Sequence, residues 1–425
     1  PSTTAAYMLW ADTSNNLLKM RNSANDGWID LRTLTGGVTT TADATINSIT
    51  VGKGANSVAG NTVLGESALD ASVSGGNNTA VGNSALTTLT SGTSNVAVGH
   101  DALLLTTTGG SNTAVGDTSG DAITTGAGNV SVGMGSLSSI TTVNSNTAIG
   151  HKAMEQATGA SNTAVGSHAM QVATASNTTA IGTSCLSALT SGSDNTGIGY
   201  QCLDANTTGG NNTAAGTGAL GQNTTASNNT AFGYIALTAN TTGSLNVAVG
   251  SKSLDANTTG AGNTAVGDDA LSANTTANTT GSRNVAVGTF AFDASTTASD
   301  NTAVGYNALT ANTTGADNSS FGASSLTANT TGINNTALGQ GALNGNTTAN
   351  NNTAVGKHAL LANTTGASNV AVGANALDAN TTASNNTAVG YQALTQDTTG
   401  AGNTAVGADA LQQMTTGGSN TAVGH

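Results

Sequence analysis

Five histidines are the first side chains to consider for metal or proton chemistry. Each lies one or two residues after one of a series of regularly spaced glycines: His100, His151, His168, His358 and His425. No two consecutive repeats carry a histidine at the same repeat position, so stacked repeats would not build a ladder of metal ligands. We therefore interpret the histidines as exposed turn residues and expect neither a metal nor another cofactor.

Cys185 and Cys202 are one repeat apart and occupy the same repeat position. Stacked strands lie about 4.8 Å apart, which is within the Cα–Cα range of about 4.4–6.8 Å that disulfides need. Side chains that point the same way in one column make the disulfide torsion unfavourable, however. The sequence favours two small buried thiols over a disulfide, and the spacing matches no zinc motif.

Four of the five tyrosines directly follow the same glycines: Tyr200, Tyr234, Tyr306 and Tyr391. Aromatic rings on an exposed surface can stack on sugars of a host envelope. The alternative is that these rings are isolated exposed aromatics in a loop. The four tyrosines are the candidate surface contacts that the sequence offers.

Catalytic groups do not recur as a set. No nucleophile, base and orienting residue repeat together, no glycine-rich loop precedes a helix, and pairs of acidic residues are scarce. We predict no catalytic residues and no enzymatic activity.

One five-residue phrase, typified by "NTAVG" at 301–305, sets the organisation of the chain. Its closing glycine appears 22 times between Gly65 and Gly424. The sequence numbers of successive glycines differ by 17 in 18 of the 21 intervals, by 16 in two and by 21 in one. Helical-hairpin repeats need about 33 to 47 residues. The much shorter period found here predicts one turn of a parallel β-solenoid.

Repeat positions are counted here from that glycine as position zero. Position −1 is apolar in all 22 repeats, −2 is Ala in 18, −3 is Thr or Val in 21, and −4 is Asn in 21. Position +4 is Leu, Met or Phe in 20 of 21 repeats. Because β-branched residues favour strands and strand side chains alternate, −3 and −1 share one face and −2 lies on the other.

The columns predict how coils would stack and associate. We expect Val at −1, two Ala and one Leu as the core of each coil, and the Asn at −4 as a hydrogen-bonded ladder, with simple turn formation as the alternative. At about 4.8 Å per strand, 22 coils would make a rod roughly 100 Å long. Using both strand faces requires packing one of them on neighbouring chains, which favours a homo-oligomer, most simply a homotrimer.

Composition limits the partners. Charged residues are 7% of the chain and the formal net charge is −13, with only eight Lys and Arg. No basic stripe could neutralise phosphates, so we expect no nucleic-acid partner, and no apolar run is long enough to insert in a membrane. The chain starts at Pro1 without a recognisable signal peptide, and we expect it to be part of a longer polypeptide.

The N-terminal segment differs from the repeats. Apolar runs separated by the turn-forming "TSNN" and "NSANDG" predict a small antiparallel β-meander over 1–37, with Trp10 and Trp28 in its core. Residues 38–60 form a predicted connector and solenoid cap, and 61–425 form the repeat shaft. The duplicated "ANTT" within "NTTANTTG" at 274–281 should bulge from a corner without disturbing the register.

Two resemblances follow from these motifs. The "NTAVG…AL" repeats over 46–425 resemble the head repeats of YadA-type trimeric adhesins, which implies a left-handed parallel β-roll in a trimer. The segment "LWADTSNNLLKMRNSANDGWIDL", followed by "ITVGKG", resembles modules of phage tail fibres, particularly of marine phages. Most repeats here are longer than the usual head repeat, so the coil outline can differ.

These observations favour a structural role. The leading hypothesis is the shaft of a phage tail fibre, located in the virion, attached to tail or baseplate proteins and supporting contact with a host glycan or receptor. The alternatives are a bacterial surface trimeric adhesin and an extracellular fibre that assembles end to end. An adhesin predicts a secretion signal and a C-terminal membrane anchor in the full gene.

Overall fold

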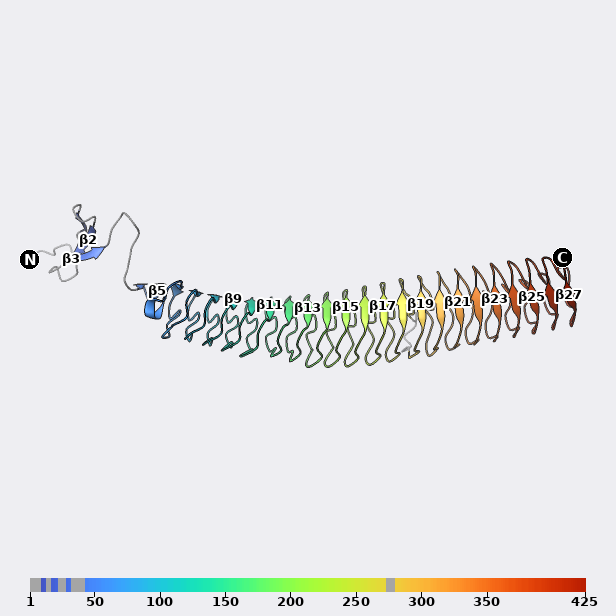
Figure 1. The fold of residues 1–425 in the computed structure, drawn as a ribbon, viewed down its shortest axis with the longest axis horizontal. Helices are drawn as coiled ribbons and strands as arrows, with labels where there is room; N and C mark the ends of the chain where they lie inside the picture. The colour runs from blue at the N-terminus through green and yellow to red at the C-terminus, as the bar shows by residue number, and fades with distance from the viewer. Residues whose placement is uncertain (1–8, 13–16, 22–27, 32–42, 273–279) are drawn as a thin grey trace, which may run out of the picture.

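The computed structural model describes residues 9–12, 17–21, 28–31, 43–272 and 280–425. It is all-β, and its dominant feature is a regularly repeating parallel β-solenoid (Figure 1). Among the described residues the only helix is a single 3₁₀ turn, Ala55–Ser57. The predicted fold class is therefore confirmed.

Three short strands form a separate antiparallel sheet near the N-terminus. β1 (Leu9–Asp12), β2 (Leu17–Arg21) and β3 (Trp28–Leu31) pair in that order as a meander. The predicted meander is present in the backbone. The prediction that Trp10 and Trp28 form its core concerns side chains outside the described ones.

A hairpin covers the first edge of the solenoid. β4 (Ala44–Ile46) and β5 (Ile49–Gly52) pair antiparallel, and β5 pairs antiparallel with the first solenoid strand, β6 (Thr62–Gly65). An uncovered solenoid end exposes unpaired strand groups. Residues 44–52 therefore cover the edge of β6, within the 38–60 segment predicted as connector and cap.

From β6 onward each coil contributes one strand, and every strand pairs in parallel with the strand of the next coil, in register. The strands after β6 are β7 (Thr79–Val81), β8 (Val96–Val98), β9 (Thr113–Val115), β10 (Val130–Val132), β11 (Thr147–Ile149), β12 (Thr163–Val165), β13 (Thr179–Ile181), β14 (Thr196–Ile198), β15 (Thr213–Ala215), β16 (Thr230–Phe232), β17 (Val247–Val249), β18 (Thr264–Val266), β19 (Val285–Val287), β20 (Thr302–Val304), β21 (Ser319–Phe321), β22 (Thr336–Leu338), β23 (Thr353–Val355), β24 (Val370–Val372), β25 (Thr387–Val389), β26 (Thr404–Val406) and β27 (Thr421–Val423).

Register survives the irregular intervals. β18 and β19 pair position for position across the single long interval, and β11, β12 and β13 do so across the two short ones. The duplicated "ANTT" falls largely on residues 273–279, which lie outside the described residues. Insertions and deletions therefore leave the strand columns unchanged.

The interior of each coil is narrow and made of small side chains. Ala at −2, Ala at +3 and Leu at +4 are fully buried, as Ala303, Ala308 and Leu309 illustrate. The residues at −3 and −1 point outward, and twelve of the residues at −1 are exposed. The prediction that Val at −1 belongs to the coil core is wrong, because alternation places it opposite the Ala that fills the interior.

The Asn at −4 forms the predicted ladder. The backbone N–H of Asn301 donates to Oδ1 of Asn284 (3.0 Å), while Nδ2 of Asn301 donates to the carbonyl of Gly315 (2.9 Å). Direct amide–amide bonds also occur, as from Asn95 Nδ2 to Asn78 Oδ1 (3.1 Å). The ladder thus uses the side-chain oxygen mainly to accept the backbone N–H of the next coil.

Candidate interaction surface

The outward sheet face carries the largest group of exposed apolar side chains. We call the −3 and −1 positions of β6–β27 the outer sheet face. Phe232 (43% exposed), Phe321 (40%) and Leu338 (50%) lie on it. None of its 44 positions holds a charged residue; all the charges of the solenoid lie elsewhere on the coil.

The outer sheet face is built by backbone pairing rather than by side-chain packing. Each strand is fixed by parallel bonds to its neighbours, with partners such as Val130↔Thr147 and Val132↔Ile149 directly opposite. β-Branched and aromatic side chains therefore line up in two columns along the sheet. The −1 column is apolar throughout and exposed at twelve positions, beside a −3 column of mainly Thr, which makes this face the candidate interaction surface.

The four candidate tyrosines lie on a corner beside that face. Tyr200, Tyr234, Tyr306 and Tyr391 are each 52–55% exposed. Tyr200 and Tyr234 are the nearest two, two coils apart, which corresponds to about 10 Å along the axis. The structure places all four at the corner predicted for them but does not gather them into one site.

A fifth aromatic ring joins one of these tyrosines. Phe290 meets Tyr306 edge to face, with ring centroids 6.4 Å apart and planes at 68°. Phe290 is at +2 and Tyr306 at +1 of the following coil, so neighbouring columns of the corner come into contact. Because the two rings belong to different columns, the repeat pattern alone does not predict this pair.

Histidines at the same corner also find partners. Nδ1 of His100 lies 2.8 Å from Oδ1 of Asp117, and Nε2 lies 3.5 Å from Oδ2 of Asp101. The rings of His151 and His168 lie in contact, with centroids 5.3 Å apart. No group of three or more His, Cys, Asp or Glu residues with the arrangement of a metal site occurs within the described ranges.

Cys185 and Cys202 are both buried and free, as the sequence predicted. Its hydrogen bond with Cys202, and then burial, raise the pKa of the Cys185 thiol above its ordinary range. Gly197 replaces the usual Ala at −2 beside this pair, because a Cβ there would lie 2.6 Å from Sγ of Cys185. The glycine makes room for the sulfur, and the Cys185 thiol remains protonated.

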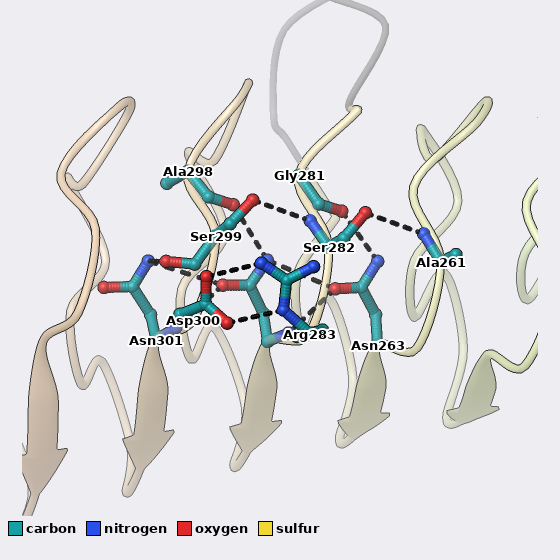
Figure 2. A network of polar contacts seen from close by, with 10 residues as sticks. Ala261, Asn263, Gly281, Ser282, Arg283, Ala298, Ser299, Asp300 and Asn301 are labelled. Carbon is teal, nitrogen blue, oxygen red and sulfur yellow. Dashed lines mark hydrogen bonds and ion pairs between the residues drawn. The ribbon is translucent and has the colours of Figure 1, made fainter.

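An exposed ion pair stands on another corner, next to the long interval. Figure 2 shows Arg283 reaching Asp300 on the next coil with two parallel bonds, Nε–Oδ1 at 2.6 Å and Nη2–Oδ2 at 2.7 Å. The pairing lowers the pKa of Asp300 and raises that of Arg283. Both groups are solvent-exposed, so the pair fixes local geometry more than it adds stability.

Beside that pair, serines continue the coil-to-coil bonding. The N–H of Ala261 donates to Oγ of Ser282 (3.0 Å), and the N–H of Ser282 donates to Oγ of Ser299 (3.1 Å) (Figure 2). These bonds run parallel to the asparagine ladder at Asn263 and Asn301. Backbone N–H groups on the corner are thereby satisfied.

A second buried asparagine column at +7 was missed by sequence reasoning. Within the described residues it has two parts, Asn206 to Asn257 and Asn312 to Asn380, separated by Ser295 and by residues outside the description, and Asp397 follows the second part. Nδ2 of Asn223 donates to Oδ1 of Asn206 (3.0 Å), and Nδ2 of Asn346 donates to Oδ1 of Asn329 (2.8 Å). Earlier coils hold Leu89, Ile123 or Leu189 at this position. The recurrence of Asn in "ANTT" was the signal, but the segment was interpreted as an exposed corner.

Comparison with protein-family models, with curated proteins and with solved structures found no match. The part of the chain that the structure describes also contains no helix long and apolar enough to cross a membrane. Function must therefore be argued from the geometry of this chain.

Proposed function

We propose that this chain is the shaft of a phage tail fibre, a stiff spacer that connects the tail or baseplate to a distal receptor-binding part. The observation that carries the proposal is the unbroken, in-register stack of 22 parallel strands from β6 to β27 (Figure 1). Each coil is bonded to the next through backbone and asparagine side chains, so bending requires breaking many bonds at once. Such a rod lengthens by adding coils without any change of core.

The proposal includes a homotrimer that packs through the outer sheet face. At about 4.8 Å per strand and about 7 Å between outward residues, 22 strands present roughly 700 Å² of sheet. That area is close to the about 800 Å² that each partner buries in a stable interface. The absence of charge on this face and its exposed Phe232 and Phe321 favour contact with copies of the same chain.

Analytical ultracentrifugation of the full chain tests the trimer. The double variant Phe232→Glu/Phe321→Glu should dissociate the trimer, because two carboxylates per chain would be buried in the interface. The double variant Thr225→Glu/Thr314→Glu is the matched control. Both threonines are exposed at position +9, so this variant should leave the trimer intact. A wild-type chain that sediments as a stable monomer would overturn this part of the proposal.

A bacterial surface adhesin is the second candidate, favoured by the exposed tyrosines at positions +1. In an adhesin the rod itself would bind a host or matrix glycan through these rings. Immunogold electron microscopy of the source culture, with an antibody to residues 9–31, separates the two. Gold at fibre bases on tailed particles supports the shaft, whereas gold on cell envelopes or on free filaments overturns it.

A further inference from the structure

The first of the two short intervals brings a pair of imidazoles together on the rod surface. His151 directly follows Gly150, and His168 is the second residue after Gly166, on the next coil. The N–H of His168 donates to the carbonyl of His151 (3.0 Å), so the two backbones are hydrogen-bonded neighbours. The contact between the His151 and His168 rings is the one contact between histidine rings in the part of the chain that the structure describes.

The repeat geometry explains this contact. In coil after coil the N–H at +2 donates to the carbonyl at +1 of the preceding coil, as from Gly218 to Tyr200 and from Lys252 to Tyr234. Residues at +1 and +2 of consecutive coils are therefore adjacent even though they belong to different columns. A search for histidines within one column cannot find the pair.

The ring nitrogens are placed to bind a ligand. Nδ1 of His168 lies 2.9 Å from Oγ of Ser167. When Nδ1–H donates to that hydroxyl, Nε2 carries the free lone pair, which is the usual arrangement of a metal-binding imidazole. Within the described structure, no hydrogen bond engages the exposed ring of His151.

The ring separation fits a shared metal ion. A Zn–N bond of about 2.1 Å and a ring radius of about 1.1 Å place each centroid about 3.2 Å from the metal, so tetrahedral ligation separates two centroids by about 5.2 Å. The observed separation is 5.3 Å, with the planes at 75°. Because the rings pack edge to face, binding one ion requires them to rotate until both lone pairs point at it.

Neighbouring charged groups do not compete for the same place. Glu155 is held by Nζ of Lys152 at 2.9 Å and by Nε2 of Gln171 at 2.7 Å. Its carboxylate is thus engaged, and the candidate ligands are two imidazoles. Imidazole prefers Zn²⁺, Cu²⁺ and Ni²⁺ over Mg²⁺ and Ca²⁺, which take oxygen ligands.

We propose that His151 and His168 form a two-imidazole site for a divalent transition-metal ion, with Zn²⁺ as the ion tested and water completing its coordination. The bound ion would join the two coils on either side of the first short interval. This site is independent of the tail-fibre proposal and of the oligomeric state.

Isothermal titration calorimetry of Zn²⁺ into the full chain, purified without a histidine tag, tests the site. One saturable site per chain is expected, at least tenfold weaker in His151→Ala and in His168→Ala. His358→Ala is the matched control, since His358 also lies at +2 but has no histidine ring beside it, and its binding should be unchanged. Mg²⁺ should give no heat of binding.

A second readout distinguishes ligation from nonspecific charge effects. Cu²⁺ bound to the wild-type chain should show nitrogen hyperfine coupling from two imidazoles in electron paramagnetic resonance, and neither single variant should show this signal. Absence of saturable Zn²⁺ binding, or equal binding by the His151→Ala/His168→Ala double variant, overturns the proposal. All variants lie on the surface, and circular dichroism checks that each retains the wild-type β signal.

Discussion

At the scale of single residues, the glycine at position zero is fixed by the approach of the next coil. Gly305 has φ +136°, and a Cβ there would lie 2.6 Å from the carbonyl carbon and oxygen of Gly322. Only glycine accepts both the backbone conformation and the contact. The invariance of this column is a requirement of stacking.

Gly305→Ala should therefore open the stack locally, at a cost of about 2 kcal/mol or more. Hydrogen–deuterium exchange in β20 and β21 should rise, and this local measurement suits a repeat protein. Gly110→Ala is the control: position +11 has no positive φ there, a Cβ would lie no nearer than 3.1 Å to a neighbouring atom, and the same position is Ala at Ala261 and Ala316. Equal exchange in the two variants would contradict the stacking argument.

Acid should stabilise one section of the rod. Burial and then the charge of Asp269 raise the pKa of Asp255 to about 6, and burial, again with Asp269, raises that of Asp293 to about 6. Folded-state pKa values above the ordinary 3.8 mean that the native state binds more protons. Their contribution to stability is therefore full below about pH 4 and is lost as the pH rises to about 6.

The measurement is the thermal midpoint at pH 4.5 and pH 6.5 for the wild type and for Asp255→Asn/Asp293→Asn. The variant removes both titrations. The change in its thermal midpoint between the two pH values should therefore be smaller than that of the wild type, by about 2 °C. Asp70→Asn/Asp378→Asn, at the same repeat position, is the control, and it should retain the wild-type pH response. A double variant with the wild-type response would contradict the assignment.

At the scale of elements, the asparagine ladder has one interruption, which predicts a stabilising substitution. Thr178 replaces Asn at −4, and its hydroxyl donates to the nearby carbonyl of Ser176 (3.2 Å). The N–H of Asn195 thereby loses the side-chain acceptor that its equivalents have. Thr178→Asn should restore the bond and stabilise the coils around β13 and β14 by about 1 kcal/mol.

The opposite change tests the same ladder. Asn229→Ala removes the oxygen that accepts the N–H of Asn246 (3.0 Å) and the amide that donates to Gly243 (3.0 Å). Two buried backbone groups lose partners, so about 2 kcal/mol or more of local stability should be lost. Protection against hydrogen exchange should fall around β16 in Asn229→Ala and rise around β14 in Thr178→Asn; no change in either would exclude a stabilising ladder.

At the scale of the whole molecule, the rod should tolerate loss of one complete coil. Deleting residues 353–369 joins Asn352 to Val370 and restores every column, because each strand pairs with the next in register. The rod should shorten by about 4.8 Å and remain folded. Deleting residues 353–362 instead shifts all later residues out of their columns and should unfold the C-terminal part. Small-angle scattering and circular dichroism would distinguish these two deletion variants.

The sequence by itself determined the period, the strand columns and the stacking. The regularly recurring glycine, preceded by Asn-Thr-Ala-Val, identifies which residues of successive coils lie opposite each other, because equivalent positions pair in register. It also placed the tyrosines on an exposed corner and the two cysteines in a buried column. These are local or periodic properties, which a linear pattern preserves.

Only the tertiary structure decided which side of each strand faces inward. Alternation assigns −3 and −1 to one face, but it is equally satisfied with that face inside or outside. The closed coil leaves space for Ala at −2 and for a second asparagine column at +7, so the Val residues lie outside. Contacts between different columns, such as His151 with His168 and Phe290 with Tyr306, depend on how side chains of neighbouring coils pack against each other, which the repeat length does not specify.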